Sequence, residues 1–249
     1  METKENQDKI LVEAMFNAGA HFAYARSRRH PQVAPYIYGM KNNVEIFDLE
    51  KTSIMLKRAR DFVRKLAQEG KQILFVGSKN EAQEIIKSAA QSLGMPYVAG
   101  RWIGGTFTNF GEIRKRVDKM EGTIEKREKG ELSKYTKKER LLIDREVERL
   151  EKFFSGIRTM KERPAAIFVI DQKKEKIAVN EAKKQNIPVV SLSGSDCDLK
   201  EVEYPIPGND SSMSSITFFV NEIAKSYQEG VRNRQMAETP VSGEASANK

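Results

Sequence analysis

The feature that most constrains the fold is an alternation of short, wholly apolar runs with longer amphipathic stretches. The runs ILFVG at 73–77 and AIFVI at 166–170 contain no charged or amide side chain, which is typical of strands buried on both faces of a parallel sheet. An amphipathic stretch follows each of them, and residues 80–93 carry apolar side chains at helical spacing. Strands that alternate with helices predict a parallel sheet covered on both faces, that is, a three-layer α/β body of the Rossmann or flavodoxin-like kind.

The same patterns place the other elements along the chain. We expect strands at 44–49, 97–99, 166–171, 188–192 and 204–206, and helices over 10–18, from about 52, over 174–185 and over 212–228. Ile177 is expected to face the core. Ser78 or Asn80 is expected to cap the helix at 80, and Asp210 or Ser211 the last helix. Residues 20–39 hold two prolines and little periodicity, and predict irregular chain.

A segment of different character interrupts the alternation. Residues 112–163 contain 17 Lys and Arg against 12 Asp and Glu, which is more than half of the net charge of +8. Two apolar seams repeat at spacings of four and three, from Ile113 to Ile124 and from Ile143 to Ile157, as in coiled coils. Thr136 and Glu139 form a capping box for the second helix. The segment therefore predicts an antiparallel helical hairpin inserted into one α/β domain at 10–230, with flexible termini at 1–9 and 231–249.

Composition limits the chemistry that the chain can perform. It has one cysteine, Cys197, and two histidines, His21 and His30. An internal disulfide framework is therefore excluded, and the spacing of these residues predicts neither a metal site nor a cofactor site. No run approaches the 18 apolar residues of a membrane span, and the N-terminus has no signal-peptide core, so we expect no membrane partner. The positive charge favours a polyanion as the partner.

Basic residues gather in three places that are candidates for phosphate contact. In 21–40, Arg28, Arg29 and His30 lie among aromatic side chains, a pattern that suits phosphates and unpaired bases, although a loop packed over the sheet would look the same. GSKNEA after ILFVG follows a strand and opens a helix, but lacks GxGxxG and GxxxxGK[ST]. It is therefore also consistent with an ordinary turn, from which Lys79 could contact a phosphate.

RWIGGTFTNFGEIRKR at 101–116 is the third of these places. It carries a double glycine and threonine and asparagine side chains that could cap the first helix of the hairpin. It suits either a phosphate loop or a structural corner with Trp102 packed beneath it, and these two interpretations are compatible. Its candidate RNA-binding residues are Arg101, Asn109, Arg114, Lys115 and Arg116.

The order of these motifs resembles one known family, the bacterial ribosomal protein S2 family. The resemblance rests on GAHF at 19–22, IFDLEKT at 46–52, ILFVGSK at 73–79, RWIGGTFTN at 101–109 and IPGND at 206–210. It extends over about residues 10–230. The chain departs from the family pattern at 23–25 and at 193–204.

The resemblance implies a function without catalysis. It implies a structural constituent of the small ribosomal subunit, in the bacterial cytoplasm, that binds the ribosomal RNA of that subunit. It further implies contacts with neighbouring small-subunit proteins and help in docking ribosomal protein S1, and we expect no homo-oligomer.

Two alternatives from other classes remain at the level of sequence. One is an α/β enzyme that binds a nucleotide or a sugar phosphate at the carboxyl edge of the sheet. The other is a coiled-coil scaffold that contacts only proteins.

Overall fold

Five short strands form one parallel sheet in the order β4–β3–β5–β6–β7. The structure is a computed structural model that describes residues 2–238. Because β4 follows β3 in the chain but lies outside it, the strand order reverses between β3 and β5, as in doubly wound flavodoxin-like sheets. This confirms the predicted α/β class. The strands are β3 (Ile73–Val76), β4 (Tyr97–Val98), β5 (Ala166–Ile170), β6 (Val189–Ser193) and β7 (Tyr204–Pro207).

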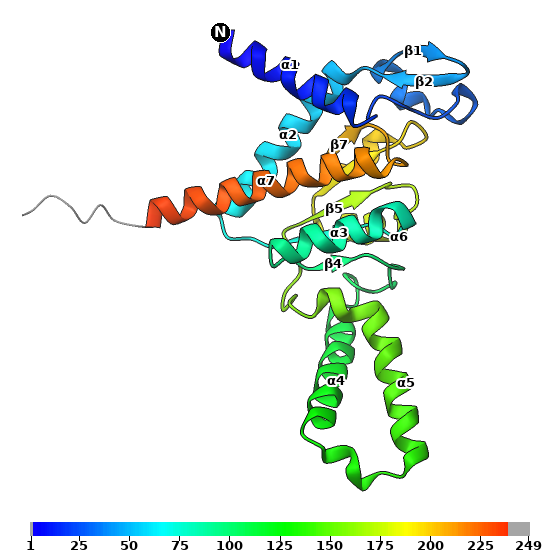
Figure 1. Ribbon diagram of the computed structural model, residues 1–249, viewed down its shortest axis with the longest axis vertical. Helices are drawn as coiled ribbons and strands as arrows, with labels where there is room; N and C mark the ends of the chain where they lie inside the picture. Colours follow the sequence, from blue (N-terminus) through cyan, green and yellow to red (C-terminus); the bar gives the residue numbers. More distant parts are fainter. Residues whose placement is uncertain (1, 239–249) are drawn as a thin grey trace, which may run out of the picture.

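Side chains of the sheet alternate between two hydrophobic cores, as strand geometry requires. Phe75 and Phe168 are paired in register and belong to one core, while their neighbours Val76 and Val169 belong to the other. Three helices cover the first face and meet along it (Figure 1). They are α2 (Leu49–Gln68), α3 (Asn80–Ser92) and α7 (Met213–Glu238).

The second face packs against α6 (Lys176–Lys184) and the base of the hairpin. Ala178 and Ala182 of α6 are buried as expected. The expectation for Ile177 is wrong, since this side chain is 59% exposed. In so short a helix only one narrow face reaches the sheet, and Ile177 lies outside it.

The N-terminal region differs most from the sequence expectation. Helix α1 (Glu2–Asn17) begins at Glu2 rather than at residue 10. Residues 20–39 are not irregular throughout, because two 3₁₀ helices and strand β1 lie within 26–41. Strand β2 exists, but it pairs antiparallel with β1 in a separate two-stranded sheet and not with the parallel sheet. The elements are η1 (Arg26–Arg28), η2 (Pro31–Tyr36), β1 (Ile37–Lys41) and β2 (Val44–Phe47).

A two-residue turn explains the antiparallel pairing. Asn42 and Asn43 both have positive φ, at 50° and 62°, which is the backbone of the tight hairpin turn whose twist matches that of its strands. Asparagine tolerates this conformation better than most residues do. VEIF therefore folds back on the strand directly before it.

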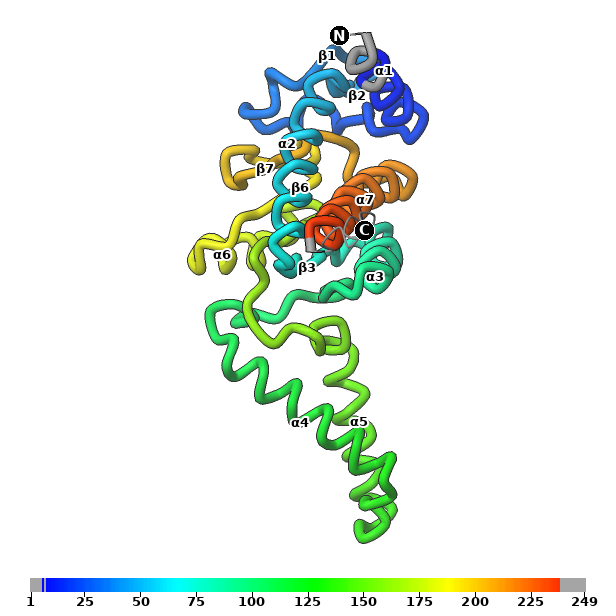
Figure 2. Tube along the Cα trace, turned by 90° about the vertical axis from the view of Figure 1, so that its left-hand side faces the viewer, coloured from blue at the N-terminus to red at the C-terminus, as the bar shows by residue number. Residues whose placement is uncertain are grey.

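The inserted segment forms two antiparallel helices that project from the body (Figures 1 and 2). The first seam, from Ile113 to Ile124, is buried along α4, and Val147 and Phe154 of the second seam are buried along α5. The capping box of Thr136 and Glu139 is present. The hairpin consists of α4 (Phe110–Glu128), η3 (Glu131–Lys134), α5 (Lys137–Phe154) and η4 (Ser155–Ile157).

The helix starts differ from the expected caps. Neither Ser78 nor Asn80 caps α3, whose N-cap position is Lys79 without a side-chain hydrogen bond. Before α7, it is the Asn209 side chain that accepts from the backbone N–H groups of Ser211 and Ser212. Helix α7 continues to Glu238, well past the predicted end at 228. The predicted flexible tail thus begins as helix, and its residues 239–249 lie outside the described residues.

Candidate nucleic-acid interface

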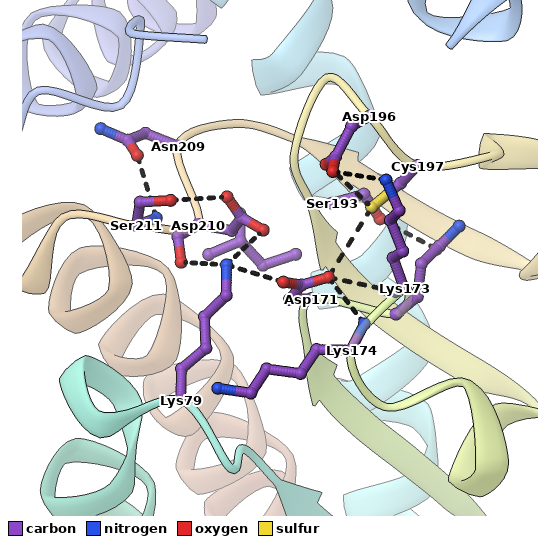
Figure 3. A network of polar contacts seen from close by, with 12 residues as sticks. Lys79, Asp171, Lys173, Lys174, Ser193, Asp196, Cys197, Asn209, Asp210 and Ser211 are labelled. Carbon is purple, nitrogen blue, oxygen red and sulfur yellow. Dashed lines mark hydrogen bonds and ion pairs between the residues drawn. The ribbon is translucent and has the colours of Figure 1, made fainter. Parts of the chain in front are cut away.

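Lys79 lies at the carboxyl edge of the sheet, at the point where the strand order reverses. Its ammonium is 2.7 Å from a carboxylate oxygen of Asp171, which follows β5, and 2.8 Å from one of Asp210, which follows β7 (Figure 3). All three side chains are largely buried. This edge is where doubly wound proteins bind their ligands, and here an internal ion-pair cluster occupies it.

The charges of this cluster perturb one another. Burial alone would lower the pKa of Lys79, but Asp210 and Asp171 outweigh it and hold this pKa above the usual range. Burial raises the pKa of Asp210, and Lys79 only partly opposes the change. One lysine between two carboxylates leaves no positive charge for a phosphate. We therefore remove Lys79 from the predicted RNA-binding residues.

The segment 24–30, which includes η1, is fastened to the same edge of the sheet. The Tyr24 backbone N–H donates to the Ser195 hydroxyl at 3.0 Å, and the His30 N–H donates to the Ser195 carbonyl at 2.8 Å. Arg28 lies 4.0 Å from the centre of the Tyr24 ring and 3.4 Å from Asp196. The two segments that depart from the family pattern, 23–25 and 193–204, thus contact each other.

The three basic candidates of this segment have different environments. The Arg28 side chain stays 57% exposed in spite of its contacts. Arg29 is mostly buried and pairs with the buried carboxylate of Glu45 at 2.8 Å. His30 caps η2 by accepting from the Gln32 N–H. Only Arg28 of the three presents most of its side chain to solvent.

The RWIGGTFTN loop is held by a residue that sequence reasoning missed. Glu181 of α6 is buried, and its two carboxylate oxygens accept five hydrogen bonds from this loop. Burial would raise the pKa of Glu181, but the hydrogen bonds from the backbone and from the Trp102 indole outweigh it and lower this pKa. The donors are the N–H groups of Gly105, Phe107 and Thr108, the Thr108 hydroxyl and the Trp102 indole N–H.

These contacts make the loop a structural corner, with Trp102 buried beneath it as expected. The expected side-chain cap of α4 is absent, because Asn109 occupies the N-cap position without a side-chain hydrogen bond. A sequence signal for Glu181 exists only in retrospect. It is an acidic residue on the apolar face of α6, between the buried Ala178 and Ala182.

The base of the hairpin separates the remaining candidates. Arg114 is mostly buried and binds Asp118, Glu121 and the Arg158 carbonyl, so it ties α4 to the chain that follows η4. Lys115 is 74% exposed and pairs only within its own helix, with Glu112. Arg116 is also exposed.

Arg101 and Asn109 are the remaining candidates, and both are exposed at the corner. Among residues 2–238, neither Arg101 nor Arg116 forms an ion pair with an acidic side chain. The structure thus leaves four candidates exposed: Arg101 and Asn109 at the corner, and Lys115 and Arg116 on α4. Lys79, Arg29 and Arg114 are engaged in internal ion pairs.

No helix within 2–238 is long and apolar enough to cross a membrane. The same part of the chain contains no group of three or more histidine, cysteine, aspartate or glutamate side chains arranged to hold a metal ion.

The fold and the site together define a doubly wound α/β protein with an inserted helical hairpin, whose usual ligand crevice is filled by its own side chains. A family model described as ribosomal protein S2 matches residues 15–230. The chain belongs to this family. It is accordingly a bacterial ribosomal protein and not an enzyme, and its location is that of the bacterial ribosome, the cytoplasm.

Individual relatives agree with the family. The chain is 42% identical over 226 residues to the small ribosomal subunit protein uS2 of Coprothermobacter proteolyticus, which covers 91% of this chain and 84% of that protein. It is 42% identical to uS2 of Wolinella succinogenes, over 89% of this chain and 82% of that protein. It is 40% identical to uS2 of a Nitratiruptor species, over 94% of this chain and 87% of that protein.

Proposed function

We propose that the chain is a structural constituent of the small ribosomal subunit, binds the ribosomal RNA of that subunit, and contacts neighbouring proteins, among them ribosomal protein S1. The names of its relatives support the first part. The net charge of +8 supports a polyanionic partner. We propose that it acts as a single copy within the subunit.

The observation that carries RNA binding is the presence of exposed cations that the protein itself does not neutralise. Arg101 and Arg116 are exposed and form no ion pair within residues 2–238. Lys115 is mostly exposed, and its pair with Glu112 lies on the helix surface, where such pairs contribute little stability and exchange readily with other partners. These three side chains can bind phosphates without loss of a buried contact.

Rigidity of the corner supports the same proposal. Arg101 and Asn109 flank a loop whose backbone N–H groups are fixed by Glu181. A fixed backbone lowers the entropic cost of ordering charged side chains when RNA binds. Arg28 is a further exposed cation, which lies beside the Tyr24 ring and near Asp196.

The hairpin supports contacts with proteins as well. Leu141 and Leu142 of α5 are 50% and 56% exposed, although apolar side chains are depleted on solvated helix surfaces. Acidic residues on the hairpin reduce its attraction to RNA and suit a protein neighbour. Docking of ribosomal protein S1 rests on the family resemblance alone.

The salt dependence of RNA binding tests the proposal. Arg101→Ala, Lys115→Ala and Arg116→Ala are combined, and binding to small-subunit ribosomal RNA is measured between about 50 and 200 mM salt. Each lost phosphate contact should reduce the log–log slope by roughly 0.7 to 0.9, so the slope should fall by about 2 to 3.

A matched control removes the same charge elsewhere. This control replaces three exposed lysines of α6 by alanine, in the variant Lys176→Ala/Lys183→Ala/Lys184→Ala. This control should keep most of the wild-type slope. Equal slopes for the two triple variants would remove the corner and the hairpin base from the RNA site.

A further inference from the structure

A pocket of about 320 Å³ opens beside the edge strand β4. Its walls come from the end of β4 and the residues after it, from α3, and from the junction of α5 with η4, elements that contact one another near the base of the hairpin (Figure 1). The volume lies at the lower end of the range for small-ligand pockets, which begins at about 300 Å³. It is too small for a helix and large enough for a single flat group.

Two aromatic rings and two free cations line this pocket. Tyr97 and Phe153 are both half-buried and both belong to the lining of the pocket. Arg101 and Lys152 are exposed on the same lining, and neither forms an ion pair within the described part of the chain. The one acidic group on the rim, Glu84, is 82% exposed and lies 3.9 Å from Lys87.

The pocket is part of the fold's architecture and not a gap left by a loose loop. Gly156 lies so close to β4 that a Cβ there would collide with the Tyr97 carbonyl oxygen. Only glycine allows this approach, which fixes the end of the hairpin against the strand. The Tyr97 and Phe153 rings are further held by the two hydrophobic cores of the body.

We infer that this pocket binds one unpaired nucleotide of RNA, with the base against the Tyr97 and Phe153 rings and a flanking phosphate on Arg101 and Lys152. Single-stranded RNA is bound in this way in general, by stacking on aromatic faces together with cations that follow the backbone. An acidic peptide would use the cations but gain nothing specific from the rings. This inference rests on the proposed function and names the part of the RNA that this corner takes.

The first test measures the binding of a short single strand at several salt concentrations. Fluorescently labelled oligoadenylate is bound to the full chain and to Arg101→Ala/Lys152→Ala, Phe153→Leu and the control Lys183→Ala/Lys184→Ala. The double variant should lower the log–log salt slope by about 0.7, the value for loss of one phosphate contact on a single strand. Phe153→Leu, which keeps an apolar side chain for the core, should weaken binding at least about fivefold, the lower end of base–aromatic stacking.

The second test locates the contact directly. Small-subunit ribosomal RNA that carries 4-thiouridine is photo-crosslinked to the chain, and the attached peptides are identified by mass spectrometry. We expect a crosslink on the peptide of Tyr97 or of Phe153, lost in Arg101→Ala/Lys152→Ala and kept in the control.

The outcomes separate this inference from the proposed function. If the wild-type chain fails to bind small-subunit RNA, the proposed function fails and the inference fails with it. If it binds that RNA, but the pocket variants equal the control and crosslinks avoid both rings, only the pocket is refuted. Displacement of oligoadenylate by oligoglutamate at lower concentration than by unlabelled oligoadenylate would also overturn it in favour of a peptide.

Discussion

Replacement of Glu181 by glutamine should destabilise the fold and remove part of its pH dependence. The carboxylate accepts from four N–H groups and one hydroxyl, two of the N–H groups on one oxygen and the other two with the hydroxyl on the second. Glutamine keeps one oxygen and turns an amide NH₂ toward donors that it cannot satisfy. The loss of about two charge-assisted bonds, at about 1.5 kcal/mol each, predicts about 3 kcal/mol.

The pH dependence gives the sharper readout. The folded pKa of Glu181 is lowered from 4.5, so its stabilisation is fully present above the unfolded value and is lost as pH falls through the folded pKa. The free energies of unfolding of wild type and Glu181→Gln, measured with urea, should therefore differ by about 3 kcal/mol near pH 7. The difference should become progressively smaller below about pH 4.5. Trp102, the single tryptophan, donates to this carboxylate and reports the site by fluorescence.

A matched control guards against a general effect of charge. Glu84→Gln changes a carboxylate that is 82% exposed with one lysine at 3.9 Å, and should alter stability by less than about 0.5 kcal/mol. The assigned role of Glu181 would be refuted if the difference in unfolding free energy between wild type and Glu181→Gln stayed constant down to pH 3. An unchanged Trp102 emission in the variant would refute it as well.

Two other substitutions test the internal contacts. Lys79→Met leaves the Asp171 and Asp210 carboxylates without their counterion, and should lower the free energy of unfolding by roughly 3–5 kcal/mol at neutral pH. Burial already raises the Asp210 pKa, so protonation of Asp210 should relieve the repulsion between the two carboxylates. Urea unfolding should therefore show a smaller loss of stability near pH 5. A cost that is independent of pH would contradict this. Thr136→Ala removes the capping box and should cost about 1 kcal/mol, seen as faster hydrogen exchange at the first turn of α5 with the sheet unchanged. Faster exchange throughout the sheet would show that the hairpin is not a separate extension.

Local pattern predicts much of this fold because its strands are short and wholly apolar. ILFV and AIFVI have no polar side that could face water, so a parallel sheet follows from them almost directly. The hairpin seams also repeat with a period that only packed helices use. The strand VEIF shows the limit of prediction from local pattern. Its composition predicts a strand but not the strand with which it pairs, because that partner is selected by the turn of two asparagines with positive φ.

The candidate site is less predictable because charge in a sequence does not show its partner. Lys79 and Arg101 look alike in the sequence, since each is a basic residue that closely follows a short strand. In the structure, however, Lys79 is enclosed by Asp171 and Asp210, whereas Arg101 is open to solvent. The contacts of Lys79 with Asp210 and of Glu181 with the corner loop join residues more than 70 positions apart. Only the folded sheet brings such groups together.

The central claim is that this chain is an RNA-binding constituent of the small ribosomal subunit. Sedimentation of a native lysate on a sucrose gradient at low and at high salt, with the chain followed across the fractions, tests it most directly. We expect the chain to migrate with small subunits and to be partly released at high salt. Arg101→Ala/Lys115→Ala/Arg116→Ala should be released at lower salt than wild type. Migration of the wild-type chain as a free protein of 28.3 kDa at both salt concentrations would contradict the account.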